Sequence, residues 1–339
     1  MSPKVSRGGA RVTIREVADR AGVALSSVSR VLNGHTAVSE SLRQRVLSAV
    51  ADLQYEPDFT AMSLRRGSTM TVGFLVRDIA SPLFADMVQA AGEHLSAHGY
   101  SLLLANSDAN PERDAALIRV LASRRVDGLL LSLASESHRE TLTALRSLRS
   151  PIVLIDRKIT DLEAGAVLTD HYSGLRKVTK HLAGRGHERI ALVTGPQEVL
   201  ASRERSRGYK AGLRSAGIRF DPQLSRMGSY AVEFGEQQVE SLLHLVSRPT
   251  AIIAGGSMLA YGILRGIRRA GLQIPSDIAL VGCDSWPFPE LFDPALTVVS
   301  RDAAQIGRTA AKMLLDSLAG ADSQIVSLPT KLIVRDTTT

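Results

Sequence analysis

VTIREVADRAGVALSSVSRVLN, residues 12–33, is the stretch from which the fold of the N-terminal region follows. Thr13 and, three residues later, Glu16 form the pattern of a capping box, in which each side chain binds the other residue's backbone N–H. The apolar positions repeat at helical spacing: Ile14, Val17, Ala18 and Ala21. Gly22 comes next, where a left-handed residue can end a helix. We therefore predict a short helix followed by a tight turn.

A second short helix is predicted from about Ala24. Its apolar face consists of Val28, Val31 and Leu32. Its opposite face is small and polar, and consists of Ser26, Ser29, Arg30 and Asn33, flanked by Leu25 and Ser27. Two such helices are typical of a helix-turn-helix, whose second helix enters the major groove of DNA. An ordinary helical hairpin fits the pattern equally well.

A third helix and a linker follow this pair. Ser39 can cap the third helix, whose apolar stripe would close a three-helix core: Leu42, Val46, Val50 and Leu53. The linker, YEPDFTAMSLRRGS at 55–68, leaves room for a short helix between Pro57 and Gly67. A helix of this length is marginal in water by itself.

From Thr71 onward, short apolar runs alternate with amphipathic stretches of ten or more residues. The runs lie at 71–76, 101–105, 128–133, 151–155, 189–194, 251–254 and 278–282. Uninterrupted apolar runs are typical of strands buried on both faces of a parallel sheet. The repeated strand–helix pattern predicts a doubly wound α/β fold. Its length predicts two lobes, with a ligand crevice at the carboxyl ends of the strands.

Composition narrows the class of protein. The chain has 339 residues, is 44% apolar and contains one cysteine, Cys283, so no intrachain disulfide framework is possible. It contains neither an apolar run long enough to span a bilayer nor an apolar signal core at its N-terminus, and we expect a cytoplasmic protein. Residues 1–67 hold 10 Lys/Arg and 6 Asp/Glu, which accounts for +4 of the net charge of +7. This concentration favours a polyanionic partner, although a generally basic protein fits the charge as well.

The N-terminal region closely resembles the DNA-binding headpiece of the lactose repressor (LacI) family of bacterial transcription regulators. The V-T-I-x-x-V-A-x-x-A-G-V frame and the V-S-R-V-L-N run are both present, and the likeness continues through Val38–Ser39 and Tyr55-x-Pro57. Two residues depart from the family pattern: Ala24 stands where Ser is usual, and Asp58 where Asn is usual. Loss of an N-cap hydroxyl typically costs ~1 kcal/mol.

The resemblance implies a sequence-specific regulator, a repressor, that binds a near-palindromic operator in double-stranded DNA as a homodimer. Leu25 and Ser26 are the expected base-reading residues, and Leu64 matches a hinge leucine that wedges into the minor groove. A linker leucine packed on the next domain is the alternative for Leu64. The full expected DNA-binding set is Thr13, Leu25, Ser26, Ser27, Ser29, Arg30, Asn33, Ser39, Tyr55, Ala61 and Leu64.

The region after the linker resembles the periplasmic-binding-protein-like core of the same family. The expected domain limits are a disordered N-terminus at 1–10, a helix-turn-helix headpiece at 11–57, a hinge helix at 58–70 and a two-lobed effector-binding and dimerisation core at 71–335. The first lobe is expected to span about 71–166 plus 298–326, and the second about 167–297 plus 327–335.

An effector crevice is implied between the lobes. Its expected lining, carried over by position, is Ser81, Leu83, Phe84, Asp156, Arg203, Tyr230, Ser257 and Asp284. Each also has a structural interpretation, such as a helix cap for Asp284 or core packing for Phe84. The family's usual Ala-Asn-Asp is replaced by Gly255-Gly256-Ser257, which removes a carboxylate suited to sugar hydroxyls. We hypothesise that the effector is not an ordinary sugar, or that the crevice has lost effector control.

Two other classes of protein compete with a regulator. A solute receptor would make the headpiece incidental and would carry a signal peptide. A sugar-processing enzyme on this fold would need a catalytic constellation, and none is evident; Ser257, for example, lacks the G-x-S-x-G frame of a nucleophile elbow. We predict no enzyme activity, no cofactor and no metal site, since His94 and His98 at helical spacing have no evident third ligand.

Overall fold

The computed structural model describes residues 12–32, 38–55, 67–284 and 289–339. Contacts divide the chain into two compact units, Met1–Thr69 and Met70–Thr339, which are described separately below. Among the described residues, no helix is both long and apolar enough to cross a membrane.

The described residues of the first unit form three helices: α1 (Ile14–Ala21), α2 (Leu25–Leu32) and α3 (Glu40–Asp52). The predicted capping box is confirmed, because the Glu16 N–H donates to the Thr13 hydroxyl and the Thr13 N–H donates to the Glu16 carboxylate. Gly22 ends α1 in the left-handed region, at φ 63°. The predicted three-helix core is also confirmed, with Val17, Val28 and Val46 fully buried at its centre. Ser39 occupies the N-cap position of α3, as predicted, although its side chain makes no capping hydrogen bond.

The second unit contains two six-stranded sheets, as the apolar runs predict. The first has the order β11-β5-β4-β3-β1-β2 and the second β12-β10-β9-β8-β6-β7. Strand pairs are parallel, except that β12 runs antiparallel to β10. The first sheet consists of β1 (Thr71–Val76), β2 (Ser101–Asn106), β3 (Gly128–Leu131), β4 (Ile152–Ile155), β5 (Gly165–Thr169) and β11 (Ile325–Leu328). The second consists of β6 (Ile190–Thr194), β7 (Ser225–Met227), β8 (Ala251–Ala254), β9 (Ala279–Cys283), β10 (Thr297–Ser300) and β12 (Lys331–Ile333).

Helices cover both faces of each sheet, which makes each lobe doubly wound. In the first lobe, α5 (Pro82–Ala97) and α12 (Ala303–Leu318) pack on one face, with α6 (Pro111–Ser123) and α7 (Arg139–Arg146) on the other. In the second lobe, α10 (Val232–Leu243) and α11 (Ser257–Arg269) pack on one face, with α8 (His171–Gly184) and α9 (Leu200–Ser215) on the other.

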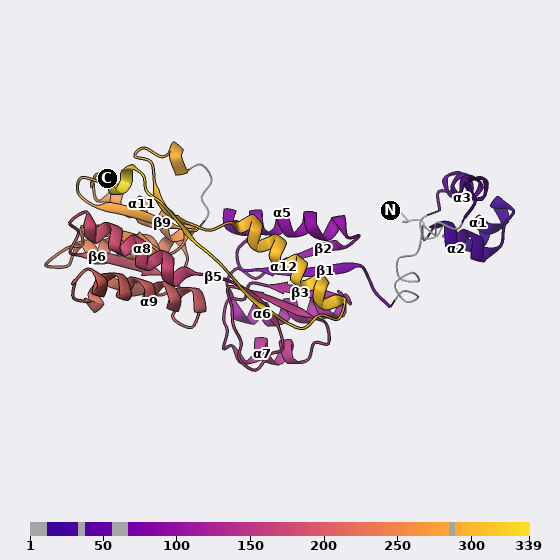
Figure 1. Cartoon of the computed structure of the whole chain (residues 1–339), viewed down its shortest axis with the longest axis horizontal. Coiled ribbons are helices and arrows are strands. Elements are labelled where there is room, and N and C mark those ends of the chain that lie inside the picture. Colours follow the sequence, from indigo (N-terminus) through magenta and orange to yellow (C-terminus); the bar gives the residue numbers. More distant parts are fainter. Residues whose placement is uncertain (1–11, 33–37, 56–66, 285–288) are drawn as a thin grey trace, which may run out of the picture. The chain divides into compact units, whose positions relative to one another are not determined.

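The chain passes between the lobes three times. It leaves the first sheet after β5, returns after β10 to form α12 against α5, and crosses again between β11 and β12. Figure 1 shows these late segments, in gold and yellow, running from one lobe to the other. Neither lobe is therefore continuous in sequence, and residues more than a hundred positions apart meet where the lobes join.

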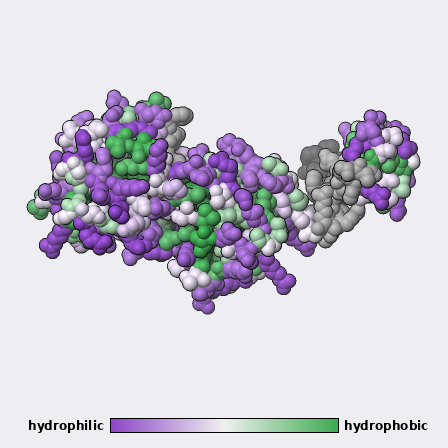
Figure 2. Space-filling model, in the orientation of Figure 1, coloured by the Kyte–Doolittle hydropathy of each residue, from purple (hydrophilic) through white to green (hydrophobic). Residues whose placement is uncertain are grey.

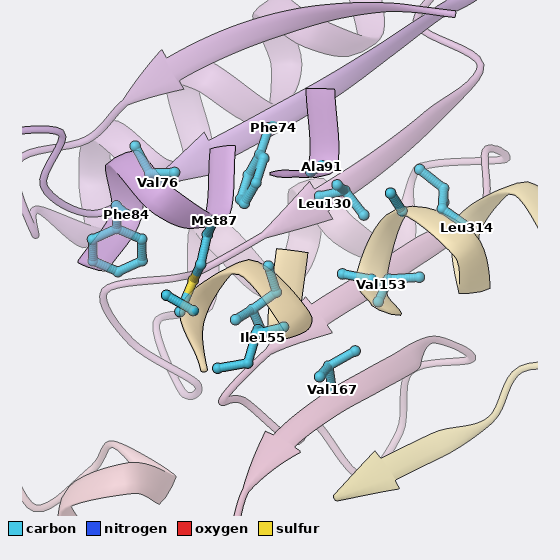
Figure 3. Close-up of a cluster of buried hydrophobic side chains, with 14 of the residues drawn as sticks. Phe74, Val76, Phe84, Met87, Ala91, Leu130, Val153, Ile155, Val167 and Leu314 are labelled. Atoms are coloured by element: carbon cyan, nitrogen blue, oxygen red, sulfur yellow. The ribbon is translucent and has the colours of Figure 1, made fainter. Parts of the chain in front are cut away.

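The core of the first lobe lies between its sheet and the α5–α12 pair. Figure 3 shows Phe74, Val153 and Val167 of the sheet facing Met87 of α5 and Leu314 of α12. All five side chains are buried. Large apolar side chains that point from both elements into one layer give the lobe a close-packed interior.

Strand β2 corrects one expectation. The apolar run at 101–105 predicts a strand buried on both faces, but β2 lies at the edge of its sheet and pairs only with β1. Leu103 and Leu104 are consequently 38% and 39% exposed. Figure 2 shows that apolar residues gather in limited patches on a mainly hydrophilic surface.

Candidate functional site

The outer face of α2 is the candidate nucleic-acid interface. Val28 and Val31 hold the helix onto the three-helix core, and this packing turns the opposite side outward. Leu25 at the start of the helix is 46% exposed, and Ser26 and Arg30 are exposed as well. Ser27 and Ser29 are half-buried. The first turn of α2 thus presents one apolar and one hydroxyl side chain, next to a guanidinium one turn later.

The other predicted DNA-binding residues lie at the edges of this interface or outside the described residues. The Thr13 hydroxyl is engaged in the capping box, where it donates to the Glu16 carboxylate at 2.9 Å. Ser39 is exposed, and Tyr55 is half-buried against the headpiece core. Asn33, Ala61 and Leu64 lie outside the described residues.

A second cluster of functional side chains forms where strands of both sheets end. Arg77 follows β1, Asp156 and Arg157 follow β4, Asp284 follows β9 and Arg301 follows β10. Asp156 and Asp284 have left-handed backbones, at φ 51° and 77°, an unusual conformation for residues other than glycine that is typical of functional sites. We name the interlobe cluster by its members: Arg77, Asp156, Arg157, His171, Arg205, Tyr230, Asp284 and Arg301.

Arg301 joins the two lobes through buried carboxylates. Its guanidinium forms an ion pair with Asp156 from the first lobe, and its Nε lies 3.0 Å from Oδ1 of Asp284 in the second. The Asp284 carboxylate also accepts from Arg205 at 2.7 Å. Asp156 accepts from the backbone N–H of Thr169 at 2.9 Å. The donors named for Asp156 and Asp284 are therefore two arginines, Arg301 and Arg205, and one backbone N–H, that of Thr169.

The charge states in the interlobe cluster follow from burial and from these ion pairs. Burial alone would raise the pKa of Asp156, but Arg301 and His171 outweigh it and hold that pKa well below its ordinary value. Burial would likewise raise the pKa of Asp284, which Arg301 and Arg205 lower instead. His171 lies 3.5 Å from Asp156, yet burial and the charge of Arg205 lower its pKa to about 4. At neutral pH both aspartates are ionised and His171 is neutral.

Tyr230 stands at the centre of the arginines. Its hydroxyl is 2.7 Å from the Ser202 hydroxyl and accepts from Nη1 of Arg205 at 3.0 Å. The guanidinium of Arg77 lies over its ring, 4.7 Å from the centroid. Glycines make room for this ring, since a Cβ at Gly195 would lie 2.0 Å from it and a Cβ at Gly256 2.9 Å. The Gly256 departure noted in the sequence is therefore where Tyr230 packs.

The structure brings only part of the predicted effector set together. Asp156, Tyr230 and Asp284 belong to the interlobe cluster. Leu83 and Phe84 are buried in the first-lobe core, where Figure 3 shows Phe84. The Arg77 guanidinium does lie 5.3 Å from the centroid of the Phe84 ring.

The remaining three residues of the predicted effector set are Ser81, Ser257 and Arg203. Ser81 precedes α5 and Ser257 begins α11, and both are buried. Arg203 reaches from α9 to Glu136 of the first lobe at 2.9 Å, with 40% of its side chain exposed.

Four arginines and one histidine of the interlobe cluster were not anticipated. Arg205 could have been predicted from the periodicity of α9. The small buried residues Ala201, Gly208 and Gly212 repeat at helical spacing and form one face of the helix. Arg205 lies on this face, whereas Arg203 does not. Arg77 and Arg301 each follow a strand directly, which is the place where polar residues of this fold converge. His171 and Arg157 carry no comparable signal.

The side chains of the interlobe cluster are suited to ligand binding. Among the residues that the structure describes, no group of three or more His, Cys, Asp or Glu side chains could hold a metal ion. Cys283 is buried beside the cluster, and burial raises its thiol pKa to about 12, which disfavours the nucleophilic thiolate. Guanidinium, carboxylate and phenol groups around an aromatic ring suit the binding of a polar small molecule.

Comparisons with known proteins match both parts of the chain. Residues 13–58 match the family described as "Bacterial regulatory proteins, lacI family", and residues 179–338 match "Periplasmic binding protein-like domain". The HTH-type transcriptional repressor PurR of Proteus mirabilis is 32% identical over 95% of this chain and 96% of its own length. PurR of Erwinia tasmaniensis is 33% identical over the same shares.

Solved structures resemble the whole chain. The lac repressor dimer bound to operator and the anti-inducer ONPF has a TM-score of 0.84 at 26% identity, and covers 97% of this chain and 99% of its own. The transcriptional regulator CelR in complex with cellobiose has a TM-score of 0.73 at 30% identity, and covers 96% and 100%.

A helix-turn-helix headpiece on a periplasmic-binding-protein-like core defines a class of ligand-responsive DNA-binding regulators. The chain belongs to the lacI family of bacterial regulatory proteins. It is a DNA-binding transcriptional repressor rather than an enzyme, and the predicted fold, family and function are confirmed.

Proposed function

We propose that this chain represses transcription as a cytoplasmic homodimer that reads a near-palindromic operator with two copies of α2, and that a small molecule bound at the interlobe cluster modulates it. The observation that carries the proposal is the outer face of α2. Leu25, Ser26 and Arg30 are exposed on a helix that the three-helix core holds rigidly. A rigid helix with short side chains in its first turn can approach base edges closely.

The proposed division of the chain follows the same logic. Residues 11–57 would form the DNA-binding headpiece and 58–70 the hinge, with Ala61 and Leu64 placed in the minor groove. Residues 71–335 would form the two-lobed core that binds the effector and dimerises. Support for dimerisation comes from the relative crystallised as a dimer on its operator, and a two-fold symmetric protein requires a near-palindromic site.

The effector is proposed to bind at the interlobe cluster because this cluster joins the lobes through ion pairs. A ligand changes DNA affinity only if it binds one arrangement of the core better than another. Support for a small-molecule ligand comes from the CelR structure, which contains cellobiose. Here, Gly256 leaves room for Tyr230 in place of a hydroxyl-binding side chain, so we retain the hypothesis that an ordinary sugar is not the effector. Micromolar binding of any common mono- or disaccharide in isothermal titration would contradict it.

Leu25→Ala tests the proposal with a matched control. Genomic fragments bound by the purified chain first identify the operator, and binding is then compared between operator and random DNA. Leu25→Ala should weaken operator binding about tenfold or more, since loss of correct readout at one base pair typically costs ~1–3 kcal/mol, and should leave random-DNA binding nearly unchanged. Leu47, on α3, is 50% exposed against 46% for Leu25, so Leu47→Ala removes a similar leucine away from the proposed interface.

Two results would overturn the proposed function. Specific operator binding that survives deletion of residues 1–67 would show that the headpiece is incidental, as in a solute receptor. Equal losses for Leu25→Ala and Leu47→Ala would show that α2 does not read bases.

A further inference from the structure

Three arginines of the interlobe cluster carry buried N–H groups that make no hydrogen bond within the described part of the chain. Nε of Arg77, Nη2 of Arg157 and Nε of Arg205 have no hydrogen-bond partner among the described residues. Arg157 and Arg205 are almost completely buried, at 1% and 2% exposure, while Arg77 keeps partial access to solvent. A buried donor without an acceptor is costly, and is usually satisfied by water, an ion or a ligand.

Two of these guanidiniums also have no carboxylate at ion-pair distance among the described residues. Arg301 and Arg205 occupy the carboxylates of Asp156 and Asp284, and Arg203 pairs with Glu136. Within the described part of the chain, neither Arg77 nor Arg157 forms an ion pair with a carboxylate. Arg157 donates instead to the backbone carbonyls of Leu133 and Asp156.

Arg77 and Arg157 are near enough to each other for their charges to interact. The pKa of Arg157 is lowered to about 10, first by burial and next by the positive charge of Arg77. Arg77 in turn lies over both Phe84 and Tyr230. Asp114 is near enough for both arginine charges to oppose the effect of burial, which raises the pKa of its carboxyl, but within the described residues it forms no ion pair with either, and its Oδ2 accepts from the N–H of Ala134.

We propose that the effector carries an oxyanion, a carboxylate or a phosphate, and that Arg77 and Arg157 bind it beside the Tyr230 ring. This inference rests on the proposed role of the interlobe cluster as the effector site. Guanidinium groups bind carboxylate and phosphate oxygens through paired, charge-assisted hydrogen bonds. An oxyanion at this position accepts from the orphaned Nε and Nη2 and brings a negative charge into direct contact with both guanidiniums. The partial exposure of Arg77 gives the anion a route from solvent.

Matched neutral and anionic probes test the proposal on the full chain without DNA. Orthophosphate, glucose 6-phosphate, glucuronate and glucose are compared at constant ionic strength, by thermal shift and by isothermal titration. We expect saturable binding of at least one oxyanion, at least tenfold tighter than that of glucose. The phosphate and carboxylate probes decide which oxyanion is preferred.

Arg77→Gln is the informative variant, because Arg77 is only partly buried, whereas Arg157 is almost completely buried. It should weaken oxyanion binding at least tenfold, and Arg77→Lys should restore part of that loss. Arg149→Gln, an exposed arginine of the same lobe, is the matched control and should change nothing. Binding of glucose as tight as that of the anions, oxyanion binding insensitive to Arg77→Gln, or no oxyanion binding at all would each overturn the proposal.

Failure of this inference is distinguishable from failure of the proposed function. Operator binding by the unliganded wild-type chain is measured separately and tests only the proposed function. A chain that binds its operator but no oxyanion would remain a repressor with a different ligand.

Discussion

His171 makes the stability of the core sensitive to mild acid. It is 4% exposed at the first position of α8, and burial together with the charge of Arg205 lowers its pKa to about 4 from an ordinary 6.5. Between these two values, the unfolded chain binds a proton that the folded chain does not. The free energy of unfolding therefore falls as the pH falls through 6.5 toward 4, and the contribution is constant again below that window.

The magnitude follows from the two pKa values. A shift of this size corresponds to a total of about 3 kcal/mol, of which about 2 kcal/mol is lost between pH 7 and pH 5. Asp156 and Asp284 do not interfere in this range, since Arg301 lowers the pKa of both carboxyls and they stay ionised. Their own stabilising contributions are lost only at pH values below their ordinary pKa near 3.8.

Urea unfolding of wild type and His171→Gln at pH 7 and pH 5, followed by circular dichroism, measures the effect. His94, His181 and His187 also have pKa values lowered by burial, but they are present in both proteins and cancel in the comparison. Wild type should lose about 2 kcal/mol more than His171→Gln on this acidification. An equal loss in the two proteins would refute the assignment of a buried, neutral His171.

Three further substitutions test the packing and the ion pairs. Thr13→Ala removes the capping box and should lower the stability of the headpiece by about 1 kcal/mol, seen as faster hydrogen exchange in α1 with unchanged exchange in the core. Gly262→Ala should lower the melting temperature of the core sharply, because the added Cβ would lie 1.9 Å from a carbonyl oxygen of α10; Gly92→Ala, in an open part of α5, should not lower it. Arg301→Gln removes the arginine partner of the buried Asp156 carboxylate, whereas Asp284 keeps Arg205. It should cost about 3–5 kcal/mol in urea unfolding, with partial recovery on adding Asp156→Asn; no recovery would show that the two side chains are not coupled.

The elements of the fold were predictable because their causes are local. A capping box spans four residues, and Thr13 with Glu16 predicts it without knowledge of the rest of the chain. A buried parallel strand is an apolar run, and 71–76 and 251–254 coincide with β1 and β8. The exposure of β2 was not predictable in this way, because an edge position depends on which strands pair, and apolar content does not encode pairing.

Residues of the candidate site were predictable only where a single position of the sequence matched the family pattern, without knowledge of its partners in space. Asp156 and Asp284 were carried over by position from the family resemblance, and each directly follows a strand, where ligand-facing residues of this fold lie. Their common partner Arg301 was not found, although it also follows a strand, because it is 145 residues from Asp156. Nothing in the sequence states which strand ends meet across two lobes that the chain crosses three times. The prediction of Arg203 rather than Arg205 as a cluster residue was avoidable. Helical periodicity along α9 places Arg205, but not Arg203, on the buried face of that helix.

The ion pairs of Arg301 indicate how a ligand bound at the interlobe cluster would change DNA binding. Arg301 is the first residue after β10, where the chain returns to the first lobe to form α12 against α5. Its guanidinium holds a carboxylate from each lobe, so the relation between the lobes and the path of this crossing depend on the same side chain. An anion that competes with Asp156 or Asp284 for Arg301 would weaken the bridge, whereas one bound only by Arg77 and Arg157 would leave it intact and add a contact to the first lobe. The direction of the effector's action on DNA binding therefore depends on which arginines it engages, and Arg301→Gln measured with and without the anion separates the two cases.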